Sequence, residues 1–431
     1  MVDPELLSKI NERRVLEFFQ SSGPTSRAAI ARACELSAPT VSKAVAALIR
    51  HGMLEECGTV VSVFGRPGRL LQIAAQTANV FGVVIDAGNC WVGSAQIDGE
   101  LSESNERTFP TPRTYSELLS LIEEQITLIS GAAGAVSPAH HSAGAIPKNG
   151  KQTPSRVRVS GSRYRGVGVS VPGLLNSRLG QTVMSPNLRF LNGEQVASDL
   201  SKKLRLPCVT LQESHALCVG ERMYGAARGL DNFAMLDVST GLGLGVVSGG
   251  RPLTGNSGLA GELGHITVDA RGVLCGCGNS GCLETVATDS AFARRVSETL
   301  GRPVQISESI ALLQSGQLQG SEAIECTIES LGIAIAAVIN IFNPATLFVH
   351  GRFLGADPLI FARVLEEAKK RSLGVSFADC RILQAKGNKR LGAIAGIIQN
   401  LADAWAPALS DFHPSMRGRR ASVEKTLLKE S

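Results

Sequence analysis

Aromatic residues are scarce in this sequence. They make up 4% of the 431 residues, with 14 Phe, 3 Tyr and 2 Trp, so the hydrophobic cores must be built mainly from aliphatic and small side chains. The 44% of hydrophobic and 19% of charged residues are those of a folded soluble protein. The length excludes a single simple core, and we expect two or three domains.

The sequence also has little net charge. Its 43 Lys and Arg against 38 Asp and Glu give +5 at pH 7, which permits nucleic-acid binding but requires a local motif to support it. No stretch is long and apolar enough to suggest a transmembrane span, and the first residues lack the apolar core of a signal peptide. The ten cysteines are clustered or scattered singly, which fits a reducing compartment. We therefore expect a cytoplasmic protein with no membrane partner.

Three of the cysteines lie together. Cys275, Cys277 and Cys282 fall within eight residues, and His265 precedes the first by ten. Three thiolates and an imidazole make a closed tetrahedral Zn²⁺ site with no position left for a reactive water. The intervening glycines suit a tight turn that directs several sulfurs inward. The alternative is a set of inert buried cysteines beside a core histidine. The density of the cluster favours structural zinc.

The first fifty residues predict a helix-turn-helix. Apolar residues recur at helical spacing over 4–20, and a short helix over 27–34 follows Gly-Pro. A three-residue turn leads to a longer helix over 38–51, capped by Ser37. Such a pair of helices typically places the second in the DNA major groove. The candidates for base and phosphate contact are Thr40, Ser42 and Lys43.

A hairpin follows the helices. Strand-like segments at 59–63 and 70–73 flank a turn that carries Arg66 and Arg69, which predicts a wing suited to the minor groove or to phosphates. Arg27 adds to a local basic excess over 26–51. The alternative is a small helical protein-protein module with a hairpin; the wing favours DNA binding.

The rest of the chain alternates strands and helices with polar or glycine-rich turns, which predicts an α/β architecture. A glycine-rich turn at 239–245 has the composition of a phosphate cradle, although hairpins use glycine as well. Residues 131–165 are small, polar and rich in Gly, Pro and Ser, as in a disordered insertion. We expect a DNA-binding domain at 1–75, a second domain at 78–410, and a disordered tail at 411–431.

These motifs together resemble the ROK family (repressors, open reading frames, kinases) over nearly the full length. The similarity rests on Gly-Arg-Pro-Gly-Arg at 65–69, on 239–245 through Gly-Glu-Leu-Gly-His at 261–265, on the cysteine cluster, and on 169–173 with Ser-Pro-Asn-Leu at 185–188. It implies a winged helix-turn-helix followed by a two-lobed, actin-like, sugar-kinase-like domain. It also implies a sugar in the cleft, and zinc held by His265 and the three cysteines.

The sequence departs from the family's kinases at three places. The Asp-x-Gly-Gly-Thr of the kinases, which handles ATP phosphates, is Asp-Ala-Gly-Asn-Cys at 86–90. The motif Asn-Asp-x-Asn is Gln-Glu-Ser-His at 212–215, so that the catalytic base becomes the longer Glu213. The nucleotide-side Gly-Gly is Gly351-Arg352. Misplacement of a base by about one methylene costs of order 10²-fold in rate. We therefore expect no enzyme activity, with Glu213 as a vestigial base.

The sugar side is better preserved. Asn187, Glu262, His265 and Glu284 match positions that hold sugar hydroxyls in the family, and carboxylates and amides suit paired hydrogen bonds to vicinal hydroxyls. Gln212 and Glu213 keep the chemical type of the sugar motif while changing its reach. The alternative for Glu262 and Glu284 is support of the zinc turn, and both roles are compatible.

The sequence thus predicts a sugar-responsive, DNA-binding transcriptional regulator of carbohydrate metabolism genes. We expect it to be a repressor whose effector is a sugar or sugar phosphate and whose partners are an operator duplex and further copies of itself, as a homodimer or homotetramer. One alternative is an ATP-dependent sugar kinase with a DNA-binding head. Another is a regulator with a dead pocket that responds to a protein partner.

Overall fold

The computed structural model describes residues 4–21, 23–50, 52–60, 68–74, 79–97, 99, 101–134, 164–385 and 388–405. Its contacts divide the chain into two compact units. Unit 1 comprises Met1–Val169, Val196–Thr210 and Ala393–Ser431, and unit 2 comprises Ser170–Gln195 and Leu211–Gly392. Most of the predicted insertion, at 135–163, and the predicted tail lie outside the described residues.

Unit 1 begins with the predicted helix-turn-helix. Its helices are α1 Pro4–Ser21, α2 Arg27–Ala33 and α3 Ala38–Arg50. The Ser26 hydroxyl caps α2 by accepting the Ala29 N–H, and the Ser37 hydroxyl accepts the Thr40 N–H at the start of α3. Buried aliphatic side chains on α2 and α3 form the core of this head: Ile30, Val41, Val45 and Leu48.

The wing strands complete the head. A sheet in the order β1-β3-β2 contains β1 Thr25–Ser26, β2 Leu54–Val60 and β3 Gly68–Ile73. The first wing strand begins earlier than the predicted 59–63, because Leu54 pairs with Ile73 and the antiparallel register continues from there. The wing tip at 61–67, with Arg66, lies outside the described residues.

The remainder of unit 1 is built on a five-stranded sheet in the order β10-β7-β4-β5-β6. The strands are β10 Cys208–Gln212, β7 Tyr164–Val171, β4 Asn79–Val84, β5 Asn89–Gln96 and β6 Leu101–Pro110. The accompanying helices are α4 Tyr115–Gly134 and α5 Val196–Leu204. Both ends of the predicted insertion differ from the prediction: residues 131–134 end α4, and residues 164–165 begin β7.

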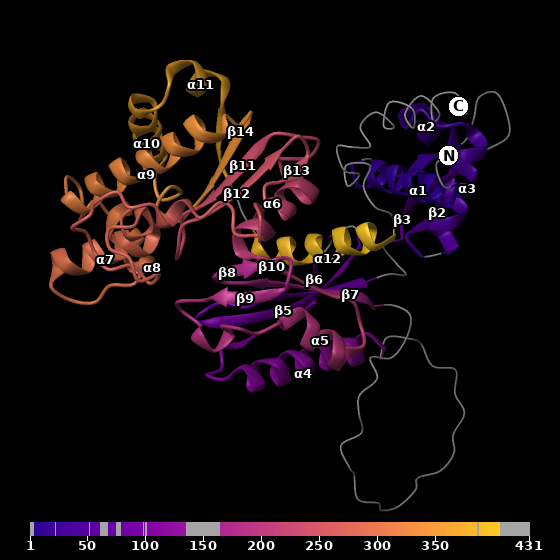
Figure 1. Cartoon of the computed structure of the whole chain (residues 1–431), viewed down its shortest axis with the longest axis horizontal. Helices are drawn as coiled ribbons and strands as arrows, with labels where there is room; N and C mark the ends of the chain where they lie inside the picture. The colour runs from indigo at the N-terminus through magenta and orange to yellow at the C-terminus, as the bar shows by residue number, and fades with distance from the viewer. Residues whose placement is uncertain are drawn as a thin grey trace, which may run out of the picture. The chain divides into compact units, whose positions relative to one another are not determined.

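The last helix, α12 (Lys389–Trp405), packs closely on this sheet (Figure 1). A Cβ on Gly168 of β7 would lie 1.8 Å from the carbonyl oxygen of Ala393, and one on Gly82 of β4 would lie 2.7 Å from Ile394 Cδ1. These two strand glycines leave the space that the helix backbone and its isoleucine occupy.

Unit 2 is built on a second five-stranded sheet in the order β13-β12-β11-β14-β15. Its strands are β13 Arg251–Pro252, β12 Gly243–Ser248, β11 Phe233–Asp237, β14 Thr346–His350 and β15 Arg381–Gln384. β11 pairs antiparallel with β12 and parallel with β14. A smaller hairpin is formed by β8 Leu174–Asn176 and β9 Gln181–Met184.

Six helices of unit 2 accompany these strands, together with three short 3₁₀ turns. The helices are α6 Glu213–Tyr224, α7 Asp289–Leu300, α8 Ile306–Gln314, α9 Glu322–Phe342, α10 Pro358–Arg371 and α11 Gly374–Asp379. The turns are η1 Arg189–Leu191, η2 Leu263–His265 and η3 Leu283–Thr285. The predicted α/β architecture is confirmed.

Among the described residues, α9 alone is long and apolar enough to cross a membrane by length and composition, which differs from the sequence-based prediction of no such stretch. Its apolar window is 61% buried. Leu331, Ile335 and Ile339 belong to the main hydrophobic cluster of unit 2. The helix is therefore apolar because it forms the centre of a core.

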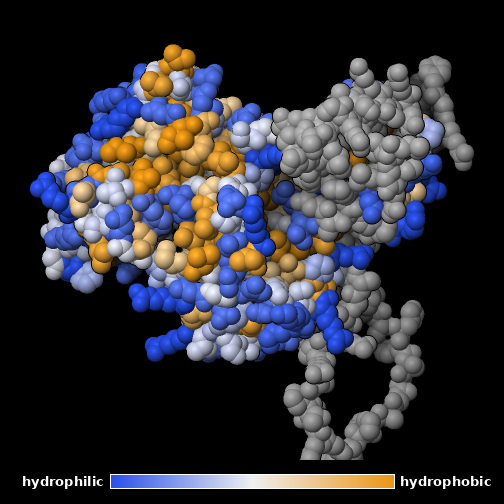
Figure 2. Space-filling view, in the orientation of Figure 1, coloured by the Kyte–Doolittle hydropathy of each residue, from blue (hydrophilic) through white to orange (hydrophobic). Residues whose placement is uncertain are grey.

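Apolar side chains are also exposed on unit 2. Figure 2 shows apolar surface over the region of α9, α10 and α11. The exposed fractions are 66% for Ile341, 70% for Leu359, 66% for Leu373 and 86% for Val375. Such side chains add apolar area to the surface of unit 2 without contributing to its core.

Candidate functional site

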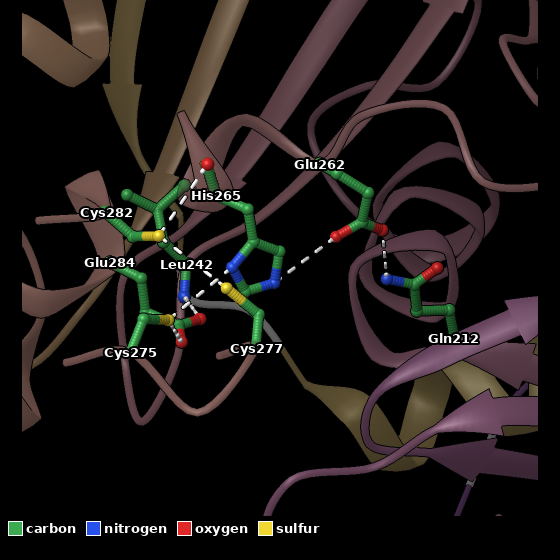
Figure 3. Close-up of polar contacts among 8 residues, drawn as sticks. All are labelled: Gln212, Leu242, Glu262, His265, Cys275, Cys277, Cys282 and Glu284. Atoms are coloured by element: carbon green, nitrogen blue, oxygen red, sulfur yellow. Dashed lines mark hydrogen bonds and ion pairs between the residues drawn. The ribbon is translucent and has the colours of Figure 1, made fainter. Parts of the chain in front are cut away.

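The four predicted metal ligands lie together in unit 2 (Figure 3). His265, Cys275, Cys277 and Cys282 each offer one ligand atom, and these atoms all lie within 4.8 Å of one another. The Cys277 and Cys282 sulfurs are 3.7 Å apart, and the Cys275 sulfur is 3.7 Å from His265 Nδ1. Two sulfurs bound at 2.3 Å in a tetrahedral site are separated by roughly 3.8 Å. The donor set and its spacing therefore fit a tetrahedral metal ion.

Glycines allow the backbone to bring these donors together. The Cys275 N–H donates to the Asn279 carbonyl at 2.7 Å, which closes the turn between the cysteines. Gly281 has a φ of +68°, and a Cβ there would lie 1.5 Å from the Asp269 carbonyl oxygen. A side chain at position 281 would therefore open the turn, which explains the glycine in the motif.

Two of the three thiols are buried. Cys275 is 4% exposed and Cys282 is fully buried, and burial raises the pKa of Cys275 to about 12. A metal ligand must be a thiolate. A bound cation is therefore the natural counter-charge for sulfurs in this position.

His265 links this cluster to a carboxylate. Its Nδ1 faces the thiols, while its Nε2 lies 3.8 Å from Glu262 Oε2. Glu262 Oε1 accepts a hydrogen bond of 3.1 Å from Gln212 Nε2 at the end of β10. Burial raises the pKa of Glu262, and the Gln212 hydrogen bond opposes that rise. Gln212, Glu262 and His265 thus form a continuous polar row that ends at the thiols (Figure 3).

Gln212 has one further acceptor. Its Oε1 is buried and has no hydrogen-bond partner among the described residues. A buried amide oxygen of this kind costs free energy unless a water or ligand satisfies it. The polar row therefore includes an unused acceptor next to Glu262.

Glu284 connects the cluster to the glycine-rich turn. Its Oε2 accepts the Leu242 N–H at 3.0 Å, and its Oε1 lies 3.7 Å from the Cys275 sulfur. A Cβ on Gly241 would lie 2.8 Å from the same carboxylate. These contacts match the alternative considered from sequence, in which Glu284 supports the zinc turn. They also occupy the turn at 239–245 that had the composition of a phosphate cradle.

Asn187 lies on a turn that touches the cysteine hairpin. A Cβ on Gly276 would lie 2.9 Å from Pro186 Cβ, so the turn at 185–188 packs directly on the backbone between the first two cysteines. The Asn187 side chain itself is exposed. The structure therefore brings Asn187, Glu262, His265 and Glu284 into one region of unit 2.

Glu213, the predicted vestigial base, is held by a cation that the sequence did not reveal. Lys389 Nζ donates to Glu213 Oε1 at 2.8 Å, and the two side chains are 17% and 23% exposed. The Glu213 carboxylate is therefore already engaged by an ammonium group. This contact joins residues 176 positions apart.

The segment at 86–90 lies in unit 1, between β4 and the start of β5. The Asp86 carboxylate accepts the neighbouring Ala87 N–H at 2.6 Å. Cys90 is fully buried, with its sulfur 3.4 Å from the Thr111 hydroxyl, and burial raises the pKa of its thiol. The side chain at the position of the kinase threonine therefore points into the core of unit 1.

An acid-histidine pair lies at the carboxyl ends of β11 and β14. Asp237 Oδ1 is 2.9 Å from His350 Nδ1, and the Asp237 side chain is 7% exposed. Burial raises the pKa of Asp237, but the hydrogen bond from His350 and the charge of Lys389 outweigh it, so that the pKa lies below its usual value. Next to this pair, Asp289 accepts the N–H groups of Arg352 and Phe353.

We predict that His350→Ala destabilises the protein at neutral pH. The ionised Asp237 contributes stability above the pKa of the unfolded carboxyl, and this contribution is lost as pH falls through the lower folded pKa. A buried carboxylate without its partner costs about 1–3 kcal/mol. The difference from wild type in the free energy of unfolding should be full at neutral pH and shrink as pH falls below about 4, the usual pKa of an aspartate, as measured by urea unfolding. The His350→Gln variant keeps a hydrogen-bond donor and should lose less of the free energy of unfolding than His350→Ala. A loss of stability in His350→Ala that is equal at all pH values would contradict the prediction.

The head presents only some of its predicted DNA-binding residues freely. Ser42 and Lys43 are exposed on α3, whereas the hydroxyl of half-buried Thr40 lies 2.7 Å from that of Ser37. Arg27 and Arg69 both pair with Glu56 of β2. Glu56 carries no local sequence signal of this role, because it is the register of β2 against β3 that brings it beside Arg69.

Two family models match the chain. The model described as the ROK family matches residues 154–398, which is more than half of the sequence. The chain belongs to the ROK family. The model described as the IclR helix-turn-helix domain matches residues 14–57. This ROK protein thus joins an N-terminal helix-turn-helix to the family's actin-like, sugar-kinase-like α/β fold, as predicted.

Similar proteins include repressors. The chain is 26% identical over 412 residues to a xylose repressor of Caldicellulosiruptor bescii, covering 92% of this chain and 97% of the relative. It is also 26% identical over 369 residues to the DNA-binding transcriptional dual regulator NagC of Escherichia coli, covering 84% of each. Xylose and N-acetylglucosamine repressors are thus among the similar proteins, and the predicted resemblance to the ROK family is confirmed.

Solved structures share the fold. A ROK family transcriptional regulator, a homologue of the E. coli MLC protein, superposes with a TM-score of 0.73 at 24% identity, covering 92% of this chain and 97% of that one. A ROK hexokinase from Thermus thermophilus superposes with a TM-score of 0.59 at 25% identity, covering 75% of this chain and 99% of the hexokinase. The regulator thus matches more of this chain than the hexokinase does.

Proposed function

We propose that this ROK protein is a sugar-responsive, DNA-binding transcriptional repressor of carbohydrate metabolism genes. One observation carries the proposal. The polar row from Gln212 through Glu262 to His265 is intact, whereas Glu213 is paired with Lys389. A sugar can therefore be held by groups that no longer include a free base, in a chain whose head has a DNA-binding motif.

The effector is a sugar or sugar phosphate bound by Asn187, Gln212, Glu213, Glu262, His265 and Glu284. Carboxylates and amides at these positions accept and donate the paired hydrogen bonds that vicinal hydroxyls require. The buried free acceptor of Gln212 supports this assignment. Effector binding shifts the population of conformations with different operator affinity.

The metal is structural zinc. The three thiolates and the Nδ1 of His265 complete a four-ligand site with no open position, which favours zinc and excludes a metal-bound reactive water. The zinc then fixes the orientation of His265, whose other nitrogen faces Glu262. We infer that the metal keeps the effector-binding residues in place.

The head at 1–75 binds an operator through α3 and the wing, with Ser42, Lys43, Arg66 and the paired arginines as contacts. The protein acts in the cytoplasm as a homodimer or homotetramer, because two heads are needed to read two half-sites. The domain at 78–410 senses the effector.

A gel shift on duplexes from upstream of the gene tests the proposal. We expect salt-dependent binding to one duplex, relieved by one member of a panel of sugars and sugar phosphates. The same panel should contain a compound that raises the melting temperature of the protein, since a ligand that binds only the folded state stabilises that state. Failure to bind any duplex specifically would contradict the function. Binding to DNA without a response to any sugar would favour a protein partner as the signal.

The second candidate is an ATP-dependent sugar kinase with a DNA-binding head. A carboxylate remains at position 213, which is the one observation in its favour. We predict no sugar-dependent formation of ADP with a panel of hexoses, because Glu213 is bound to Lys389 and the segment at 86–90 lacks the kinase glycine and threonine. Turnover in a coupled assay that Glu213→Ala abolishes would establish the kinase instead.

A further inference from the structure

Glu56 lies among the basic residues of the DNA-binding head. It is on β2, and its carboxylate is paired with two arginines from different elements. Arg69 Nη1 contacts Glu56 Oε2, and Arg27 Nη2 lies 3.5 Å from Glu56 Oε1. Arg27 is the first residue of α2 and Arg69 is on the second wing strand. One acidic side chain thus joins the helix-turn-helix to the wing.

The sheet brings these three residues together. Both Thr25 of β1 and Glu56 of β2 are paired with Leu71 of the central strand β3, one on each side. Arg27 follows β1 by one residue, so it emerges near Glu56 across the width of β3. The arrangement depends on the strand order β1-β3-β2 and is not a local pattern in the sequence.

The three side chains are accessible and charged. The side chains of Arg69, Arg27 and Glu56 are 66%, 37% and 32% exposed. The hydrogen bond from Arg69 holds the pKa of Glu56 below its usual value, with a further contribution from Arg27. Glu56 therefore remains ionised at neutral pH and offers each guanidinium group the same kind of partner that a DNA phosphate would offer.

We infer that Glu56 competes with the DNA backbone for Arg27 and Arg69 and so limits the affinity of the head for duplexes of any sequence. The inference rests on the proposed DNA-binding function. A phosphate contact carries no sequence information, so the competition weakens operator and random DNA alike. Its effect is to lower the fraction of the protein that is bound to DNA at a given salt concentration, without changing the ratio of specific to non-specific affinity.

Glu56→Gln tests this competition because it keeps the shape of the side chain and removes its charge. Exposed ion pairs are weak, so we expect a rise of about threefold to tenfold in affinity for both an operator duplex and a random duplex. The logarithmic salt dependence should become steeper by roughly one to two, since one or two more phosphates are contacted. Fluorescence anisotropy of the full-length protein across a series of salt concentrations measures both quantities.

Glu55→Gln is the matched control. Glu55 is the neighbouring residue of the same strand, and its carboxylate accepts from the neutral Gln72 amide at 2.8 Å. The Glu55→Gln variant loses the same charge without releasing an arginine. Its affinity for DNA and the salt dependence of that affinity should therefore stay near those of wild type. Melting temperatures of both variants establish that the head is folded.

The outcomes are distinct. The inference is overturned if the Glu56→Gln protein binds DNA with the same affinity as the Glu55→Gln protein. It is also overturned if Glu56→Gln binds DNA more weakly than wild type, because Glu56 would then position the arginines for DNA. A gain that persists when Arg27 and Arg69 are both changed to Gln would overturn it too. If wild type binds neither duplex, the proposed function itself fails and the inference falls with it.

Discussion

Replacing Cys275 with serine is expected to remove the metal from the chain and to abolish its response to sugar. Cys275 is almost fully buried between His265 and Glu284. Loss of a mere outer contact to a metal site costs 10–100-fold in affinity, so we expect loss of a direct ligand to cost at least about 100-fold. Without the metal, His265 is no longer fixed against Glu262. Elemental analysis and the sugar-dependent gel shift measure the two effects.

Cys277→Ser should behave like Cys275→Ser. Cys326→Ser is the control, since Cys326 is a half-buried free thiol on α9 outside the cluster. Binding to the operator in the absence of sugar should survive in all three variants, because the head has its own core. A Cys275→Ser protein with unchanged metal content and an unchanged sugar response would refute the role of the site.

Glu262→Gln should weaken sugar binding by about 10- to 150-fold. A hydrogen bond to a charged group contributes about 1.5–3 kcal/mol, and each 1.4 kcal/mol is a factor of ten in affinity. The variant keeps the shape of the side chain and an acceptor for Gln212, so the effect should come from the lost charge. Calorimetric titration with the sugar identified in the panel measures it.

Glu298→Gln is the control for this change. Glu298 is 61% exposed on α7 and is paired with Arg294, so its loss should leave sugar affinity unchanged. The metal content of Glu262→Gln must also be measured, because Glu262 lies beside a metal ligand. Sugar affinity like that of wild type in a metal-loaded Glu262→Gln protein would remove Glu262 from the effector site.

Local signals in the sequence were sufficient to predict the helices of the head and the grouping of the metal-ligand candidates. The capping serines, Ser26 and Ser37, place the starts of α2 and α3. The cysteines and His265 are close in sequence, so glycine-rich turns can bring them together over a short distance. In each case the information lies within about twenty residues.

Contacts over long distances were not predictable in this way. The pairing of Lys389 with Glu213 depends on where α12 begins relative to α6, and the pairing of Glu56 with Arg27 and Arg69 depends on strand order. No local pattern in the sequence delimits helices α5, α7, α8 and α10 or strands β6 and β15. Their apolar residues are interrupted by polar ones, and packing against the two sheets stabilises them more than their own sequences do.

The close packing of α12 on β4 and β7 has a consequence for the order in which the molecule can fold. The ribosome makes β4 about three hundred residues before the Ala393 and Ile394 that cover its glycines. Unit 1 therefore cannot complete its core until unit 2 has been synthesised. The five-stranded sheet of unit 1 is started early but is among the last parts to be finished. For most of synthesis it has an uncovered apolar face that is open to chaperones and to aggregation.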